Sequence, residues 1–317
     1  QGSILTRIAS SHIRVGTFQY AAAQQDIKIL KSLFNYTVER HYSDIKNSEN
    51  IYIELLKEFS LKQINLITNW MRVGFIHGVM NTDNMTLSGE TIDYGPCAFM
   101  NNYDPNTKFS SIDHMGRYSY KNQPIIAQWN IARFAETLLP LISSDLNEAI
   151  KSAEHVIKSI PETYKTCWLN MMRKKLGLVD NDNKDENIIN SLLSWMESNN
   201  ADFTNTFVDL MHEKNLDHSI YKSQDFMNWF KIYKKRKFSK NFSKSKSFEI
   251  MKKNNPLVIP RNNILEDVLE SADHGNLSPL KKFLKVLENP YDNNTKISNY
   301  YKNDLKSNEP YMTFCGT

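Results

Sequence analysis

Residues 70–100, WMRVGFIHGVMNTDNMTLSGETIDYGPCAFM, carry the pattern that decides the fold of this chain. The pattern predicts a helix, a loop that brings Asn84, and a tight hairpin that turns at Ser88-Gly89. Counting outward from that turn, Asn84 begins the first strand and Asp93 ends the second, so we expect the two side chains to face each other. An amide oxygen and a carboxylate held in this way form a half-site for a Mg²⁺ or Mn²⁺ ion that also binds phosphate oxygens.

The same stretch has the order and spacing of the protein-kinase catalytic apparatus, in which HRDxxxxN is followed by a hairpin and then by DFG. On that template His77 takes the histidine place, and Asn84 and Asp93 take the two metal-ligand places. Val79 stands where the catalytic base belongs, and Asp83 is the nearest substitute carboxylate. Each residue alone is explained as a turn former, but the ordered set favours a site.

The composition is that of an ordinary globular chain. Its 317 residues are 40% hydrophobic and 23% charged, with no stretch apolar enough to span a bilayer and no signal segment. The three cysteines, Cys97, Cys167 and Cys315, lack the spacing of a metal site or a disulfide framework. We therefore expect a protein of a reducing compartment, with no membrane partner.

Charge is concentrated in residues 231–253, which hold ten Lys or Arg and one Glu. The segment alone carries +9, whereas the whole chain carries +4. A nucleic-acid or anionic surface is one interpretation, but a solvated connector over residues 231–254 is commoner for a run rich in Ser and Lys. We do not expect nucleic acid to be a partner.

Apolar periodicity predicts a mainly α chain with a small β-hairpin. Residues 96–123 have the composition of a loop, and Trp70 and Trp129 lie on apolar helix faces that we expect to be core. The predicted helices cover residues 21–42, 61–75, 124–140, 144–159, 162–176, 186–197, 202–214, 263–272 and 278–287.

Four blocks of the sequence closely resemble the selenoprotein O family. They are LTRIASSHIRVGTFQ, HGVMNTDNM followed by SGETIDYGPCAFM, GRYSYKNQPIIAQWNIARFAETLLP, and the terminal FCGT. The resemblance implies a protein-kinase-like fold that binds ATP in an inverted orientation and transfers AMP to Ser, Thr or Tyr hydroxyls of proteins. Some bacterial members are associated with UMP transfer from UTP instead.

The resemblance also implies roles for individual residues. Asn84 and Asp93 match the metal ligands, and Asp83 matches the proposed catalytic carboxylate. Arg7 and Arg14 match two arginines implied in phosphate binding. The expected cofactor is Mg²⁺ or Mn²⁺, the expected nucleotide substrate is ATP, and the expected partners are proteins that present a hydroxyl side chain.

The chain opens with Gln1, and the family's nucleotide-binding lysine and helix glutamate would lie upstream of it. We therefore expect the C-terminal lobe of a kinase-like fold with additional C-terminal helices, inactive by itself. The predicted divisions are a remnant of the N-terminal lobe (1–20), the lobe (21–230), the basic connector (231–254) and a helical extension with a tail (255–317). A bacterial protein of this family is expected in the cytoplasm, and a eukaryotic one in mitochondria.

Local geometry gives a separate reason to pair Arg7 with Arg14. Two strands joined by a turn at Ser10-Ser11 would place Arg7 opposite Arg14, and a helix would also put them on one face. Facing guanidinium groups repel unless an anion lies between them, which predicts a phosphate clamp. Two separate surface salt bridges are the alternative.

Two residues have a structural interpretation that we prefer. Cys315 matches the family's selenocysteine or cysteine position, but Phe109 stands near the place of the cysteine that pairs with it in some members. Cys97 is the nearby alternative partner, although a small core residue is the simpler explanation. His77 is interpreted as a packed histidine that bonds the backbone of the Asp93 turn.

Three functions compete at this point: a protein adenylyltransferase, a true kinase, and a non-catalytic pseudokinase scaffold. Val79 at the base position argues against the kinase. The retained Asn84 and Asp93 argue against the scaffold, since a scaffold has no use for a divalent-ion half-site.

Overall fold

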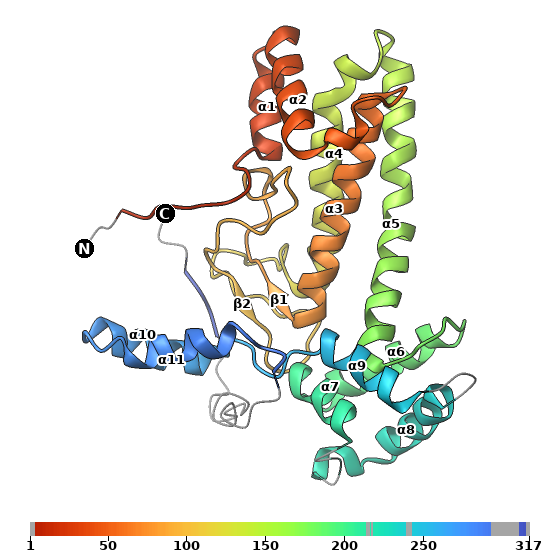
Figure 1. Cartoon of the computed structure of the whole chain (residues 1–317), viewed down its shortest axis with the longest axis vertical. Helices are drawn as coiled ribbons and strands as arrows, with labels where there is room; N and C mark the ends of the chain where they lie inside the picture. The colour runs from red at the N-terminus through yellow and green to blue at the C-terminus, as the bar shows by residue number, and fades with distance from the viewer. Residues whose placement is uncertain (1–3, 214–215, 217, 239–242, 293–310, 315–317) are drawn as a thin grey trace. The chain divides into compact units, whose positions relative to one another are not determined.

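The computed structural model describes residues 4–213, 216, 218–238, 243–292 and 311–314. The described chain is mainly helical, as the sequence predicts (Figure 1). It divides into two compact units whose segments alternate along the chain. The first unit holds the described residues of Gln1–Thr68, Val79–Gly95 and Asn122–Cys167, and the second holds those of Asn69–Gly78, Pro96–Lys121 and Trp168–Thr317. The four predicted divisions stay a prediction.

The first unit is built from helices around an aromatic core. They are α1 (Val15–Ala23), α2 (Ile27–His41), the larger part of α3 (Ile51–Val73), α4 (Gln123–Ile142) and the larger part of α5 (Leu146–Leu176), with the 3-10 turns η1 (Ser43–Ile45) and η2 (Thr82–Asn84). Phe134 of α4 packs against Phe18 of α1 and Phe59 of α3, with ring centroids 5.0 and 4.7 Å apart. All three rings are buried, so this cluster fixes α1 against α4.

Three predictions of helix boundaries in this unit are wrong. The predicted helix 61–75 begins ten residues too late, since α3 starts at Ile51. The predicted helix 21–42 is interrupted at Gln25, whose φ of 56° is left-handed, and α2 then starts behind the N-cap Asp26. The predicted helices 144–159 and 162–176 are one helix, α5, that runs through Pro161. A proline in a helix leaves the carbonyl four residues earlier without its partner. Here that carbonyl, of Ile157, accepts a hydrogen bond from Gln128 Nε2 at 3.4 Å.

Trp129 is not the core residue that its apolar face predicts. Its exposed fraction is 39%, and the guanidinium of Arg133 lies over its ring at 5.3 Å from the centroid. Arg133 is one helical turn further along α4, so a cation–π contact covers the indole where tertiary packing does not. Trp70, in contrast, is buried as predicted.

The second unit contains the small sheet and the C-terminal helices. Its helices are the end of α3, the end of α5, α6 (Asp185–Ser198), α7 (Phe203–His212), α8 (Gln224–Lys237), α9 (Lys244–Asn254), α10 (Asn262–Asp273) and α11 (Ser278–Leu287), with the larger part of η3 (Tyr120–Asn122) and η4 (Ser219–Lys222). The sheet pairs β1 (Phe75–Ile76) with β2 (Ala98–Phe99) in antiparallel register, Phe75 opposite Phe99. The predicted hairpin at residues 85–93 is therefore not the sheet of the described chain, although it forms a turn.

The basic segment is helical in its described parts, which the sequence pattern missed. It forms the end of α8 and most of α9, and Tyr233 and Met251 are buried within it. Aromatic residues in α8 have modest helix propensity, and packing of Trp229 on Tyr233, with ring centroids 5.1 Å apart, supplies the missing stabilisation.

Lys175, near the end of α5, is buried in the second unit. Its Nζ donates to Arg72 O at 2.8 Å and lies 4.1 Å from the ring centroid of Phe207. Burial lowers the pKa of this amine well below its ordinary value. Within the described part of the chain, no helix is both long and apolar enough to cross a bilayer.

Candidate functional site

A hollow of about 740 Å³ lies in the first unit, between the N-terminal segment and the residues that follow the predicted turn. Its charged and polar lining comes from both segments and includes Arg7, His12, Arg14, Glu90, Asp93 and Tyr94. Three of the five predicted site residues thus share one cavity. The other two, Asp83 and Asn84, belong to η2 and do not line this hollow.

Buried polar side chains from α3, α4 and the end of α2 hold the loop that carries these residues. The bonds run from Asn130 Nδ2 to Met80 O at 2.9 Å, from Gln63 Nε2 to Thr86 O at 2.8 Å, and from the Tyr42 hydroxyl to Leu87 O. A buried donor without a partner costs more than the bond itself stabilises, so each side chain specifies where the backbone must lie. The sequence analysis did not identify these three residues. The pattern that could have indicated them is a polar side chain on an otherwise apolar helix face.

The N-terminal segment runs antiparallel to the loop. Leu87 N donates to Ile13 O and Val15 N donates to Met85 O, both at 2.9 Å, and Arg14 forms an isolated bridge with Thr86. Arg14 is also the N-cap residue of α1. The predicted strand pair and the helical alternative for residues 5–16 are both wrong, because the partner of this segment is the loop rather than itself.

The turn at Ser88-Gly89 forms as predicted, with Gly89 at a φ of 78°. Its register differs by one residue from the prediction, since Met85 pairs with Thr91. Extending that register sets Asn84 opposite Ile92 instead of Asp93. The reason is the closure of the turn, in which the Thr86 hydroxyl donates to Glu90 O and accepts from Glu90 N.

Glu90 fastens the N-terminal segment to this turn. Its carboxylate accepts from the hydroxyl of Ser10 at 2.8 Å, from Ser10 N at 3.1 Å and from the Ser88 hydroxyl at 2.9 Å. Arg40 of α2 donates to Ser10 O from the other side. The hydrogen bond from the Ser10 hydroxyl is the main cause that lowers the pKa of Glu90 below its ordinary value of 4.5. Glu90 therefore holds Ser10, which lies between Arg7 and Arg14 in the chain.

Asn84 is buried and has a fixed orientation. Its Nδ2 donates to Val79 O at 2.9 Å, and its backbone N–H donates to Asn81 O. Because the nitrogen is committed, the amide presents Oδ1 as its free end, and no described residue donates to that oxygen. A neutral oxygen held in this way fits the ligand preference of a hard divalent cation.

Asp93 and Arg7 form an ion pair. The distance from Arg7 Nη1 to Asp93 Oδ1 is 2.7 Å, and the two side chains are 48% and 33% exposed. Asp93 also has a left-handed backbone with a φ of 61°, and its carbonyl accepts from Gly95 N at 2.8 Å. An Asp in that conformation is tolerated more readily than most side chains, and such outliers gather at functional sites. The Asp93 carboxylate, which here binds the Arg7 guanidinium, is also a suitable ligand for a divalent metal ion.

Asp83 lies against the first turn of α1. A Cβ built on Gly16 would be 2.1 Å from Asp83 Oδ1, so the carboxylate occupies the space that any larger residue at position 16 would need. Asp83 is exposed and has no hydrogen-bond or ion-pair partner among the described residues. The partial positive charge at the N-terminal end of α1 favours a carboxylate there.

Arg14 differs from Arg7 because its side chain has no partner in the described part of the chain. Its guanidinium makes no hydrogen bond or ion pair with a described residue, and its Nε is buried without an acceptor. A buried guanidinium nitrogen without an acceptor is unfavourable unless a ligand supplies one. The prediction that Arg14 faces an anion is therefore consistent with this geometry.

His77 is fully buried and stacks on Trp70, with ring centroids 5.3 Å apart. The prediction of a packed histidine is confirmed in this respect, and its bond to the Asp93 turn stays a prediction. The ring lies in the second unit with β1, to which it is adjacent in the chain.

Residues 1–288 match the family model described as protein adenylyltransferase SelO. The chain belongs to the SelO family. Relatives called protein nucleotidyltransferase YdiU are 51% identical to it in Clostridium perfringens (strain SM101) and Pelagibacter ubique, and 50% identical in Bacillus cereus (strain AH820). The matches cover all of this chain but 65 to 66% of each relative, so the chain spans about two thirds of their length.

This SelO family chain has no cluster of three or more His, Cys, Asp or Glu side chains that could hold a metal among its described residues. The predicted half-site needs only the Asn84 oxygen and the Asp93 carboxylate, with phosphate oxygens completing the shell. Cys97 and Cys167 are free thiols, and Cys315 lies outside the described residues.

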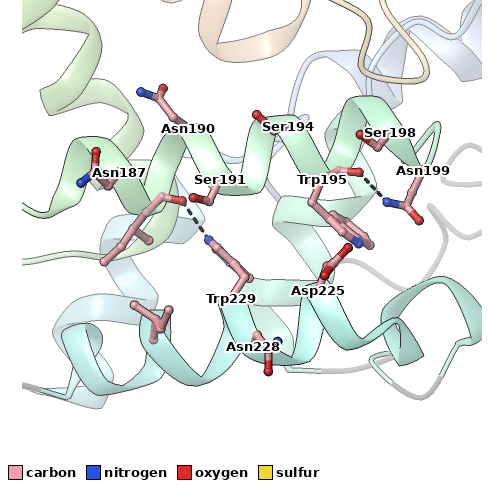
Figure 2. A pocket seen from close by; sticks show the side chains of 12 residues that line it. Asn187, Asn190, Ser191, Ser194, Trp195, Ser198, Asn199, Asp225, Asn228 and Trp229 are labelled. Carbon is pink, nitrogen blue, oxygen red and sulfur yellow. Dashed lines mark hydrogen bonds between the residues drawn. The ribbon is translucent and has the colours of Figure 1, made fainter.

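A second pocket of the SelO family chain lies in the second unit, between α6 and α8 (Figure 2). It encloses about 640 Å³, and its polar lining is mostly Asn and Ser, with Asp225 as its one ionisable residue among the twelve. The indole N–H of Trp229 donates to Ile188 O at 2.8 Å, and that of Trp195 donates to the Ser223 hydroxyl. Both indoles are therefore engaged in joining the helices, which is a structural role.

Proposed function

We propose that this chain carries the metal-binding and catalytic groups of a protein adenylyltransferase, which transfers AMP from ATP to a Ser, Thr or Tyr hydroxyl of a protein. The proposal includes a kinase-like arrangement of the region that bears Asn84 and Asp93. The observation that carries it is the shared hollow of Asp93, Arg7 and Arg14, in which Arg14 has no acceptor from the described part of the chain. Membership of a family whose curated relatives are called nucleotidyltransferases supports it.

In the proposed reaction, the acceptor hydroxyl oxygen attacks the α-phosphorus of ATP, the bond to the β-phosphate bridging oxygen breaks, and pyrophosphate leaves. Asp83 accepts the hydroxyl proton, which is consistent with a carboxylate that is exposed and has no partner among the residues that the structure describes. Arg14 and Arg7 bind phosphate oxygens. Asn84 Oδ1 and the Asp93 carboxylate would hold a Mg²⁺ or Mn²⁺ ion, which supplies charge neutralisation to the phosphates.

The test uses the complete protein that contains this chain, incubated with metal and with ATP labelled on either the α- or the γ-phosphate. We expect label from the α-phosphate to enter protein and label from the γ-phosphate not to enter it. Entry of the γ-label identifies a kinase, and entry of neither label, while nucleotide still binds, identifies a scaffold. A parallel reaction with α-labelled UTP measures UMP transfer against AMP transfer.

Asp93→Ala is the decisive variant in that assay. We expect it to abolish transfer while its thermal unfolding stays close to that of the parent, because Asp93 is partly exposed and its ion pair is a surface one. Transfer near the parental level would contradict the metal assignment.

A further inference from the structure

The two arginines of the hollow are in different states, although the sequence gives them the same role. Arg7 binds the Asp93 carboxylate at 2.7 Å, whereas Arg14 has no acceptor among the described residues. Arg7 lies in a segment without regular structure, while Arg14 caps α1 and pairs with Thr86. Arg7 is thus the arginine that can move, and Arg14 is the one held in place.

The position that Arg7 takes on Asp93 is one that a divalent cation would need. The Arg7 guanidinium is 2.7 Å from Asp93 Oδ1, so a divalent cation bound to the same carboxylate would be close to it, and the two positive charges would repel each other. Arg7 and the cation therefore compete for Asp93. Both side chains are partly exposed, so the ion pair is weak enough to be exchanged.

Glu90, the other carboxylate that lines the hollow, is not an alternative partner for Arg7. Glu90 is satisfied by Ser10 and Ser88, and its bonds hold the chain three residues beyond Arg7. Because Ser10 is bound to Glu90, the Arg7 side chain stays close to the hollow when it is released from Asp93. Released there, it joins Arg14 opposite a phosphate group.

From this geometry we propose that Arg7 is an internal cation that holds Asp93 in the metal-free protein and is exchanged for the divalent ion when the site is loaded. The inference rests on the proposed function and adds a regulation to it. Metal binding makes Arg7 available to the nucleotide, and in the absence of metal Arg7 keeps Asp93 neutralised in its left-handed conformation. Metal and nucleotide binding are therefore coupled through one side chain.

The test measures Mn²⁺ binding without nucleotide, from the free-ion electron paramagnetic resonance signal, in the complete protein. We expect Arg7→Ala to bind Mn²⁺ about two- to fivefold more tightly than the parent, which is the range of a partly exposed ion pair. Arg7→Lys keeps the charge and should stay close to the parent. Arg14→Ala is the matched control, because it removes an equal charge from the same hollow and breaks no ion pair.

A second titration adds ATP to the metal-loaded protein, where Arg7→Ala should bind the nucleotide more weakly than the parent. Opposite effects of one substitution on the two ligands are expected of an exchanged cation and not of a structural residue. Equal Mn²⁺ affinities of Arg7→Ala and Arg14→Ala, including no binding by either, would overturn the exchange. Asp93→Ala distinguishes failure of the exchange from failure of the proposed metal site. We expect this variant to lose Mn²⁺ binding. If it still binds Mn²⁺, the proposed metal site is wrong, whatever the Arg7 variants show.

Discussion

The Asp83 carboxylate lies where a Cβ of residue 16 would be, at 2.1 Å from the position that an ideal Cβ on Gly16 takes. Gly16 is in the first turn of α1, and Asp83 is in η2. The absence of a side chain at position 16 is therefore what lets the proposed catalytic carboxylate rest on the N-terminal end of a helix.

Gly16→Ala should separate activity from stability. Alanine favours a helix by up to about 1 kcal/mol over glycine, and the exposed Asp83 side chain can swing aside at little cost. The displaced carboxylate should lower AMP transfer on the order of ten- to a hundredfold, with thermal unfolding unchanged or slightly improved. The control is Gly16→Ala in an Asp83→Ala background, where no further loss is expected. An additive loss would mean that position 16 acts through something other than Asp83.

Asn84→Ala and Asn84→Asp should both be less stable than the parent, and they should differ in metal affinity. Aspartate should be the less stable of the two, because its carboxylate would be buried against the Val79 carbonyl. Both lose the bond from Asn84 Nδ2 to Val79 O, which costs about 1 kcal/mol. Alanine also removes the oxygen ligand and should weaken Mn²⁺ binding on the order of tenfold, whereas aspartate keeps an oxygen and should bind closer to the parent. Chemical denaturation and Mn²⁺ titration measure the two effects. Equal metal affinities would remove Asn84 from the ligand set.

Glu90→Gln should reveal a pH-dependent contribution to stability. The folded-state pKa of Glu90 lies below its ordinary value of 4.5, so the carboxylate stabilises the folded protein above about pH 4.5, and that contribution is lost as pH falls through the folded pKa. The neighbouring charged groups are Arg40 and His41, of which His41 contributes to the lowered pKa. The difference in free energy of unfolding between parent and variant should be constant from pH 7 to pH 5 and shrink below pH 4.5. A difference that stays constant into the acid range would show that the carboxylate's charge is not what binds Ser10.

Lys175→Met should stabilise the second unit at neutral pH. Burial lowers the folded-state pKa of Lys175 well below 10.5. The free energy of unfolding is therefore reduced at every pH at which the unfolded chain keeps the Lys175 proton, that is, below about pH 10.5. Methionine keeps the packing against Phe207 and should add about 1 kcal/mol at pH 7, or roughly 2 °C in Tm. The gain should shrink as pH approaches 10.5. Lys174→Met, at the exposed neighbouring position, serves as the control and should show no such pH dependence.

Prediction of the helices succeeded where one apolar face dominates the pattern. The predicted helix 278–287 has the bounds of α11, and the predicted helix 186–197 falls one residue short of α6 at each end. The prediction of helices failed at α8 and α9, because their many lysines conceal the few buried positions. It also failed at Pro161, where a side chain from α4 donates a hydrogen bond to the carbonyl that the proline leaves without a partner. Local pattern carries no information about such a partner.

The chemistry of the candidate site follows from the sequence alone, because residue types and their order along the chain decide which ligands they suit. Asn84, Asp93 and Asp83 were named from their spacing, and Arg7 and Arg14 from the family resemblance. Tertiary structure decided what those residues contact. The loop pairs with residues 13–15, and the Thr86 hydroxyl closes the turn in a register one residue away from the predicted one. Arg14 Nε is buried without an acceptor among the described residues. Arg7 reaches Asp93, 86 positions away in the chain, because Glu90 and the helices beneath the loop fold the two segments together. Such contacts depend on long-range hydrogen bonds and buried amides, whose energies exist only once the chain is folded.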